Sequence, residues 1–232
     1  MKKGFDEYAE AYDSWFLENP NVLRSELKLV AHVLKDAGNI LSVGCGSGLF
    51  EKLLRDEFDI NITEGVEPSE GMAAIARKRG MNVTIATAED TEFENGKYDT
   101  ILFNGCPSYI SDLHKTVKKV FDILPEGGRI ILIDVPKESG YGILYNLAKA
   151  VGSWDHPLLQ GCHPRNPYPI ELVNQANWRT TAEKIKTLEE AGFKKISFAQ
   201  TLSAHPLYSD LKEEDPMEGY DKGDYVAITG WK

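Results

Sequence analysis

Short apolar segments alternate with amphipathic ones through the middle of the chain, and this alternation constrains the fold more than any other feature. The apolar segments predict strands at Asn39–Val43, Ile62–Glu67, Val83–Ala86, Tyr98–Phe103 and Arg129–Val135. Helical periodicity fills three of the gaps, at Phe50–Phe58, Ser69–Arg79 and about Ser111–Leu124. Because strands that alternate with helices form βαβ units, the pattern predicts a mostly parallel sheet with right-handed crossovers.

The two ends of the chain add further elements to this sheet. The first 37 residues show two amphipathic helices joined near Pro20. A capping-box pattern at Thr180–Glu183 predicts a helix that stops at Gly192. Two more strands are then expected, at Lys195–Leu202 and Asp224–Trp231.

Composition limits the partners and the compartment. The 232 residues carry 26 Lys and Arg against 36 Asp and Glu, a net charge of −10, which disfavours binding to nucleic acid or to anionic membrane surfaces. Part of this charge lies in Asp210–Asp224, which is expected to be a solvated loop. The three cysteines show no CxxC spacing, and the chain shows neither a signal peptide nor a membrane-spanning run. A cytoplasmic protein is expected.

A glycine-rich turn follows the first predicted strand, with Gly44, Gly46 and Gly48 in the segment ILSVGCGSGL. At the carboxyl edge of a parallel sheet, glycines let the backbone approach a ligand closely, and the following helix N-terminus attracts an anionic group. Glu67 stands nineteen residues after Gly48, at the end of the next strand, where a carboxylate accepts hydrogen bonds from ribose hydroxyls. Leu49 occupies the third glycine position of the dinucleotide fingerprint, and no Walker motif is present.

Four ordered segments carry a resemblance to the class I S-adenosylmethionine (SAM)-dependent methyltransferases, in the small-molecule branch that includes ubiquinone- and menaquinone-type enzymes. They are LSVGCGSG, VEPSEGM, TAEDTEFENGKYDTILFNG and LPEGGRIILID, within about Ile40–Val135. The resemblance implies SAM as cofactor and S-adenosylhomocysteine (SAH) as its product. It also implies a set of cofactor-binding residues: Tyr12, Gly44, Cys45, Gly46, Glu67, Pro68, Met72, Thr87, Ala88, Glu89 and Asn104.

Within that set the resemblance assigns parts of the cofactor to particular residues. Gly44, Cys45, Gly46 and Asn104 are placed at the methionine part, Glu67 at the ribose, and Met72, Thr87 and Ala88 at the adenine. Two departures stand out, because many relatives carry an acid where this chain has Ser42 and Thr87. The carboxylate that would order the loop from position 42 is therefore absent, and Glu89 is a substitute for an acid at position 87.

The expected fold is a doubly wound, Rossmann-like α/β sheet of seven strands, mostly parallel with an antiparallel last strand, and with helices on both faces. Residues 1–37 are expected to form an N-terminal helical lid on a SAM-binding domain of residues 38–232. A substrate cap is expected at about 136–178. Its aromatic density suits an apolar pocket, with contributions from Tyr141, Tyr145, Trp154, Tyr168 and Trp178.

Catalytic residues are less defined, because displacement on a sulfonium methyl needs an oriented acceptor more than a fixed catalytic group. Tyr12 lies in line with Tyr8 and Trp15 on one helix face, as a cofactor or lid contact or as a packing residue. His156 and His163 are candidate general bases, and as readily solvated loop histidines. They lack metal-ligand spacing, so no metal is expected.

The sequence therefore predicts methyl transfer from SAM to a small-molecule acceptor by in-line displacement. Two alternatives stay open: a non-catalytic SAM-binding sensor or assembly protein, and an NAD-dependent oxidoreductase. No nucleic-acid or membrane partner is expected, and the chain is expected to act as a monomer or homodimer.

Overall fold

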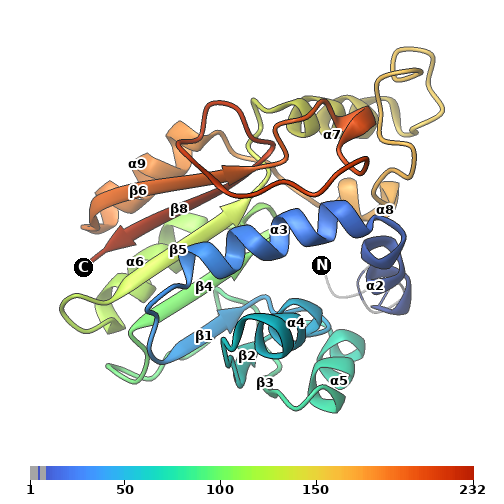
Figure 1. Ribbon diagram of the computed structural model, residues 1–232. Coiled ribbons are helices and arrows are strands. Elements are labelled where there is room, and N and C mark those ends of the chain that lie inside the picture. Colours follow the sequence, from blue (N-terminus) through green and yellow to red (C-terminus); the bar gives the residue numbers. More distant parts are fainter. Residues whose placement is uncertain (1–4, 6–8) are drawn as a thin grey trace.

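The computed structural model describes residue 5 and residues 9–232, and its centre is a mixed eight-stranded sheet (Figure 1). Across the sheet the strands are β3 Asn82–Thr84, β2 Glu64–Val66, β1 Ile40–Val43, β4 Thr100–Asn104, β5 Arg129–Asp134, β8 Tyr225–Trp231, β6 Lys194–Thr201 and β7 Met217–Glu218. The seven predicted strands are all present, with bounds shifted by one or two residues. The prediction of seven strands was wrong by one.

The additional strand, β7, lies inside the acidic stretch that was expected to be a solvated loop. Met217 and Glu218 pair antiparallel with Gln200 and Ala199 of β6. The Gln200 side-chain amide also donates to the Glu218 carbonyl at 2.8 Å. Periodicity cannot reveal such a strand, because it is two residues long and takes its hydrogen bonds from a distant segment.

Strand direction separates the sheet into two parts. β3, β2, β1, β4 and β5 run parallel, whereas β8 is antiparallel to both β5 and β6, which confirms the predicted antiparallel last strand. Side chains of β5 alternate between the two faces: Ile131 and Ile133 join one core cluster, and Ile130 and Leu132 join the other. The sheet is therefore buried on both sides.

Helices cover both faces, as a doubly wound fold requires. α3 (Pro20–Val33) and α4 (Leu49–Phe58) pack on the face that contains Ile131, while α6 (Leu113–Ile123) and α9 (Thr181–Ala191) pack on the opposite one. α5 (Glu70–Lys78) packs beside β3. The predicted capping box of α9 is present, because Thr180 and Glu183 exchange hydrogen bonds.

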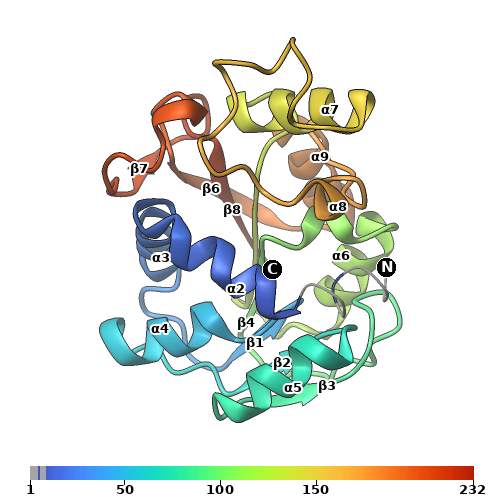
Figure 2. The ribbon, with the colours of Figure 1, turned by 90° about the vertical axis from the view of Figure 1, so that its right-hand side faces the viewer.

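α2 (Ala9–Glu18), α7 (Gly140–Val151) and α8 (Ile170–Val173) gather at the end of the molecule toward which the parallel strands point (Figure 2). α7 lies in the segment 136–178, where the sequence showed weak periodicity, and Ser139 caps its first turn by accepting from the Gly142 N–H. Two 3₁₀ turns complete the fold, at Pro107–Tyr109 and Pro206–Tyr208. No helix among the described residues is long and apolar enough to cross a membrane.

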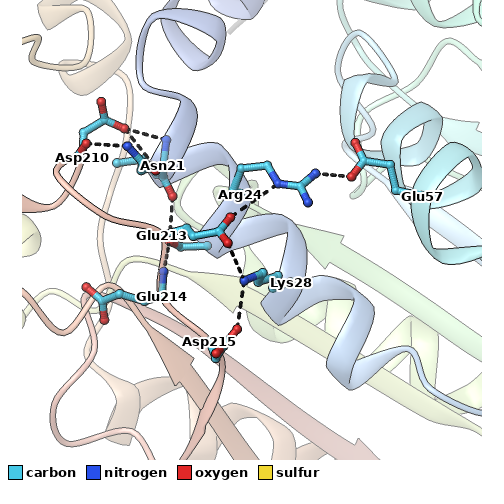
Figure 3. Close-up of polar contacts among 10 residues, drawn as sticks. Asn21, Arg24, Lys28, Glu57, Asp210, Glu213, Glu214 and Asp215 are labelled. Atoms are coloured by element: carbon cyan, nitrogen blue, oxygen red, sulfur yellow. Dashed lines mark hydrogen bonds and ion pairs between the residues drawn. The ribbon is translucent and has the colours of Figure 1, made fainter.

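The acidic segment of residues 210–215 anchors the outer side of α3 through hydrogen bonds and ion pairs (Figure 3). The Asp210 carboxylate accepts from two backbone N–H groups in the first turn of α3, at 2.8 and 3.0 Å. Lys28 lies 3.0 Å from Glu213 and 2.9 Å from Asp215, and Arg24 also pairs with Glu213. These acids are therefore paired with one helix, which fixes the orientation of its inner face.

Candidate functional site

The glycine-rich turn predicted as a binding loop joins β1 to α4 in a conformation that its glycines make accessible. Gly44 and Gly46 have φ values of +69° and +55°, in the left-handed region. A Cβ on Gly44 would lie 2.7 Å from Cβ of Cys106, so this position has no room for a side chain. A Cβ on Gly46 would meet no atom of the described residues within 4 Å, so the turn borders open space there.

Glu67, at the end of β2, holds this turn in place. Its carboxylate accepts from the Gly46 N–H at 2.9 Å and from the Ser69 N–H at 2.8 Å, and the residue is 6% exposed. A carboxylate is an acceptor-only group, and the two backbone N–H groups fix its position beside the turn.

A cavity of about 790 Å³ opens beside this turn, and we call it the strand-end cavity. Of the eleven residues predicted to bind the cofactor, ten line it: Tyr12, Gly44, Gly46, Glu67, Pro68, Met72, Thr87, Ala88, Glu89 and Asn104. The sequence did not single out several other lining residues, among them Phe5, Cys106, Tyr109 and Ile110, and Tyr168 was expected in the aromatic pocket.

Cys45 is the predicted cofactor-binding residue that the structure does not bring to the cavity. Its thiol packs in a small cluster with α5 and β3, formed with Ala73, Ala76, Met81 and Val83. Burial raises the pKa of this thiol well above its ordinary value, and nearby Glu51 raises it further. Cys45 is therefore a small apolar packing residue here.

Glu51 of α4 supplies the carboxyl group that the chain lacks at position 42. The Ser42 hydroxyl donates to Glu51 at 2.6 Å, and both residues are buried beneath the turn. Burial raises the pKa of the Glu51 carboxyl, while the bond from Ser42 opposes this rise. A carboxyl group is thus present under the loop, although the sequence pattern placed none there.

α2 is linked to the same turn by a polar junction. Asp13 accepts from the Ser47 hydroxyl at 2.5 Å and pairs with Arg79 at 2.6 Å, and Arg79 also donates to the Ser47 carbonyl at 2.8 Å. This junction fixes the part of α2 that carries Tyr12. Tyr8, the other predicted tyrosine of this helix face, lies outside the described residues.

A second cavity, of about 520 Å³, adjoins the first, and we call it the aromatic cavity. It shares Tyr12, Asn104, Gly105, Tyr109 and Tyr168 with the strand-end cavity. Its remaining lining comes from distant parts of the chain: Trp15, Phe16, Glu26, Phe50, Asp134, Val135, Tyr145, Trp178 and Tyr225. The expected aromatic pocket from segment 136–178 is thus supplied by Tyr145, Tyr168 and Trp178.

The remaining residues predicted for this region lie elsewhere. His156 and His163 line neither cavity; the first accepts from the Leu158 N–H, and the ring of the second lies 6.0 Å from that of Trp154. Tyr141 is hydrogen-bonded to Ser209 in the core. Among the residues that the structure describes, no group of three or more His, Cys, Asp or Glu could hold a metal ion.

The charged residues that line the two cavities are all acids. Glu67 and Glu89 line the first, Glu26 and Asp134 the second, and no Lys, Arg or His of the described chain lines either. Burial raises the pKa of Glu26 to about 8, and the charge of Asp134 adds to this rise. Both cavities therefore favour cationic ligands over anionic ones.

Comparison with known proteins places this architecture in a family. The methyltransferase domain family matches residues 16–197. An uncharacterized protein of Methanocaldococcus jannaschii is 32% identical over 232 residues, with 98% of each chain covered. The structure of a SAM-dependent methyltransferase from Thermotoga maritima, described as a possible histamine N-methyltransferase, superposes with a TM-score of 0.82 at 31% identity and 98% coverage of both chains.

A third relative is more distant. A malonyl-[acyl-carrier protein] O-methyltransferase of Priestia megaterium is 26% identical over 136 residues, which cover 56% of this chain and 49% of that protein. Together with the family match, the fold agrees with that of SAM-dependent methyltransferases. The chain belongs to the methyltransferase domain family and is a class I SAM-dependent methyltransferase.

Proposed function

We propose that the strand-end cavity binds SAM and that the aromatic cavity binds the small-molecule methyl acceptor. The observation that carries this assignment is the set of five residues shared by the two cavities, which lets two ligands meet at one wall. Methyl transfer by displacement needs its two reactants held together in one orientation. Two adjoining cavities of different chemical character supply that arrangement.

The residues of the strand-end cavity fit SAM. The open space beside Gly46 accommodates a ligand against the backbone, and Glu67 can accept from ribose hydroxyls. Pro68, Met72 and Ala88 offer an apolar surface for adenine, and Asn104 belongs to the shared wall. SAM carries cationic groups and no phosphate, which agrees with a lining that contains acids and no basic residue among the described positions.

SAM supplies a methyl group bound to a sulfonium sulfur, so the protein need only orient the acceptor and exclude water. Tyr12, Tyr109 and Tyr168 form part of the shared wall, and burial raises the pKa of all three hydroxyls. These side chains therefore stay neutral at physiological pH. Their rings shield the meeting point of the two ligands from solvent.

The state of the cysteines bears on the compartment of the enzyme. We place the enzyme in the cytoplasm, since Cys45, Cys106 and Cys162 are all free. We also propose that it acts as a monomer or homodimer. Thiol titration of the unfolded, unreduced protein should find three thiols, and light scattering should give the mass of one or two chains. A disulfide or a larger assembly would contradict this placement.

Calorimetry with SAM, SAH and NAD tests the cofactor assignment directly. We expect micromolar binding of SAM and SAH and none of NAD, because the described residues of the lining offer no cation for the pyrophosphate. Preference for NAD would overturn the assignment. Transfer of labelled methyl from SAM to small molecules then separates an enzyme from a non-catalytic SAM sensor, which would bind SAM without turnover.

A further inference from the structure

The aromatic cavity contains a buried acid that the assigned function does not explain. Glu26 lies on the inner face of α3, between the buried side chains of Leu23 and Val30, and is 7% exposed. Within the described part of the chain its carboxyl makes no hydrogen bond or ion pair, although Asn21, Arg24 and Lys28 anchor the outer side of α3. A buried carboxyl without a partner is costly, which points to a ligand as its partner.

Asp134 supplies a second acid to the same cavity, from the carboxyl end of β5. It is 4% exposed, and it accepts from the Ser108 hydroxyl and the Val135 N–H. Burial raises the pKa of Asp134, whereas the nearby Lys184 ammonium lowers it. Asp134 thus has both bonds and a counter-charge, whereas Glu26 has neither among the described residues.

Aromatic rings surround these two acids. The rings of Tyr145 and Trp178 lie 4.8 Å apart, and those of Trp15 and Tyr168 lie 5.1 Å apart. Ring faces attract cations, and the attraction strengthens where water is excluded. Acids and aromatic walls together form a site for an organic cation with an apolar body.

We propose that the methyl acceptor is a small amine with an aromatic or apolar body, that its nitrogen is held between the carboxyl groups of Glu26 and Asp134, and that Glu26 accepts the proton that this nitrogen loses before methylation. This inference rests on the proposed function, which places the acceptor in the aromatic cavity. It adds the chemical class of the acceptor and the residue that recognises it.

The step moves one proton and one methyl group. The ammonium group transfers one proton to the Glu26 carboxylate, which frees the nitrogen lone pair. The lone pair forms the new N–C bond as the S–C bond breaks, and the bonding electrons stay on sulfur, which becomes the neutral thioether of SAH. The product leaves as a methylated ammonium ion, so the positive charge of the sulfonium passes to nitrogen.

The surroundings of Glu26 agree with this role. The titratable groups that face it are Asp134 from β5, Tyr12 from α2, Tyr141 and Tyr145 from α7, Tyr168, and Tyr225 from β8. None of these is a cation, and burial raises the pKa of Glu26 to about 8. Its carboxylate is therefore a stronger proton acceptor than a solvated one.

The test uses the full chain saturated with SAH and a panel of matched probes. The panel pairs benzylamine, 2-phenylethylamine and tryptamine with the corresponding alcohols. We expect at least one amine to bind at least ten-fold more tightly than its alcohol. The isosteric variant Glu26→Gln should lose that difference and keep its SAH affinity, whereas Glu189→Gln, at an exposed acid of α9, should behave as the wild type.

Proton counting gives a readout that a merely structural role would not produce. At pH 7 an incoming ammonium ion must displace the proton of Glu26, so calorimetry in two buffers of different ionisation enthalpy should show about one proton released per amine. In Glu26→Gln this release should be absent. Equal binding of amines and alcohols, or an unchanged amine affinity in Glu26→Gln, would overturn the proposal while SAH binding still supports the proposed function. Failure of the wild type to bind SAH would instead overturn the proposed function itself.

Discussion

The strand-end cavity and the aromatic cavity share a wall but are built in different ways. The first is formed mainly by backbone turns within residues 43–110, at the ends of β1, β2 and β4. The second is formed by side chains from α2, α3, β5, α7 and β8, which are distant in sequence. The acid of the first, Glu67, is bonded to the backbone, whereas Glu26 in the second is not bonded within the described chain.

This difference separates two tasks. A cavity built from turns and hydrogen-bonded acids keeps its shape whatever side chains surround it, which suits a cofactor common to a family. A cavity built from side chains on separate elements changes with each substitution, which suits an acceptor that differs between relatives. Variants of the two cavities should therefore affect different measurements.

The largest effect should come from Glu26 and concerns the pH dependence of stability. The pKa of Glu26 rises on folding to about 8, from an ordinary value of 4.5, so its contribution to stability is complete below about pH 4.5 and is lost as the pH rises through 8. In urea unfolding, the free energy of unfolding should fall less between pH 5 and pH 9 in Glu26→Gln than in the wild type, by on the order of 3 kcal/mol. Glu189→Gln serves as the control. Parallel curves for wild type and Glu26→Gln would show that Glu26 is not buried unpaired.

The next effect concerns the bonded acid. Glu67→Ala removes the acceptor for Gly46 and Ser69 as well as the expected ribose contact, so SAH should bind more weakly by about 1.5–3 kcal/mol. Glu70→Ala, at an exposed acid of α5, is the matched control. An unchanged SAH affinity would remove Glu67 from the cofactor site.

A smaller effect is expected at the junction between α2 and the glycine turn. Asp13→Ala leaves Ser47 and Arg79 without their shared acceptor, so stability should fall by about 1–2 kcal/mol and SAH affinity by roughly ten-fold. Asp56→Ala removes an exposed ion pair with Lys52 and should change neither quantity. If Asp13→Ala lowered stability alone, α2 would be structural and would not hold the cofactor turn.

The smallest effect should leave both cavities intact. Thr180→Ala removes the capping box of α9 and should lower the free energy of unfolding by about 1 kcal/mol. Because this cap contacts neither cavity, affinities for SAH and for an amine should stay unchanged. A change in either affinity would show that the two cavities are coupled to the outer face of the sheet.

Much of the strand-end cavity could be predicted from the sequence, because the residue patterns that indicate it are local. The glycines at 44 and 46 and the acid at 67 each occupy a position fixed by the ends of β1 and β2. Periodicity found seven strands for the same reason. It missed α7, in which apolar residues extend around most of the helix, so that Ile143 is exposed while Tyr141 and Leu144 are buried.

The acceptor side gave weaker signals. Glu26 interrupts the apolar stripe of α3, and Asp134 is the second-to-last residue of the predicted strand Arg129–Val135. Both patterns are present in the sequence, but neither indicates a pair. His156 and His163 drew attention by residue type alone. Nothing in their spacing placed them inside or outside a cavity.

By itself, the sequence determined the doubly wound sheet, the glycine turn and the acid beside it, because short-range periodicity and backbone conformation depend on neighbouring residues. Only the tertiary structure decided which acids face each other, that Glu51 supplies the acid missing at position 42, and that Cys45 packs beside α5 and does not line the strand-end cavity. Those outcomes depend on how separate elements pack against one another. A buried carboxyl becomes functional through what surrounds it, and for Glu26 the surroundings come from segments distant in sequence that meet only on folding.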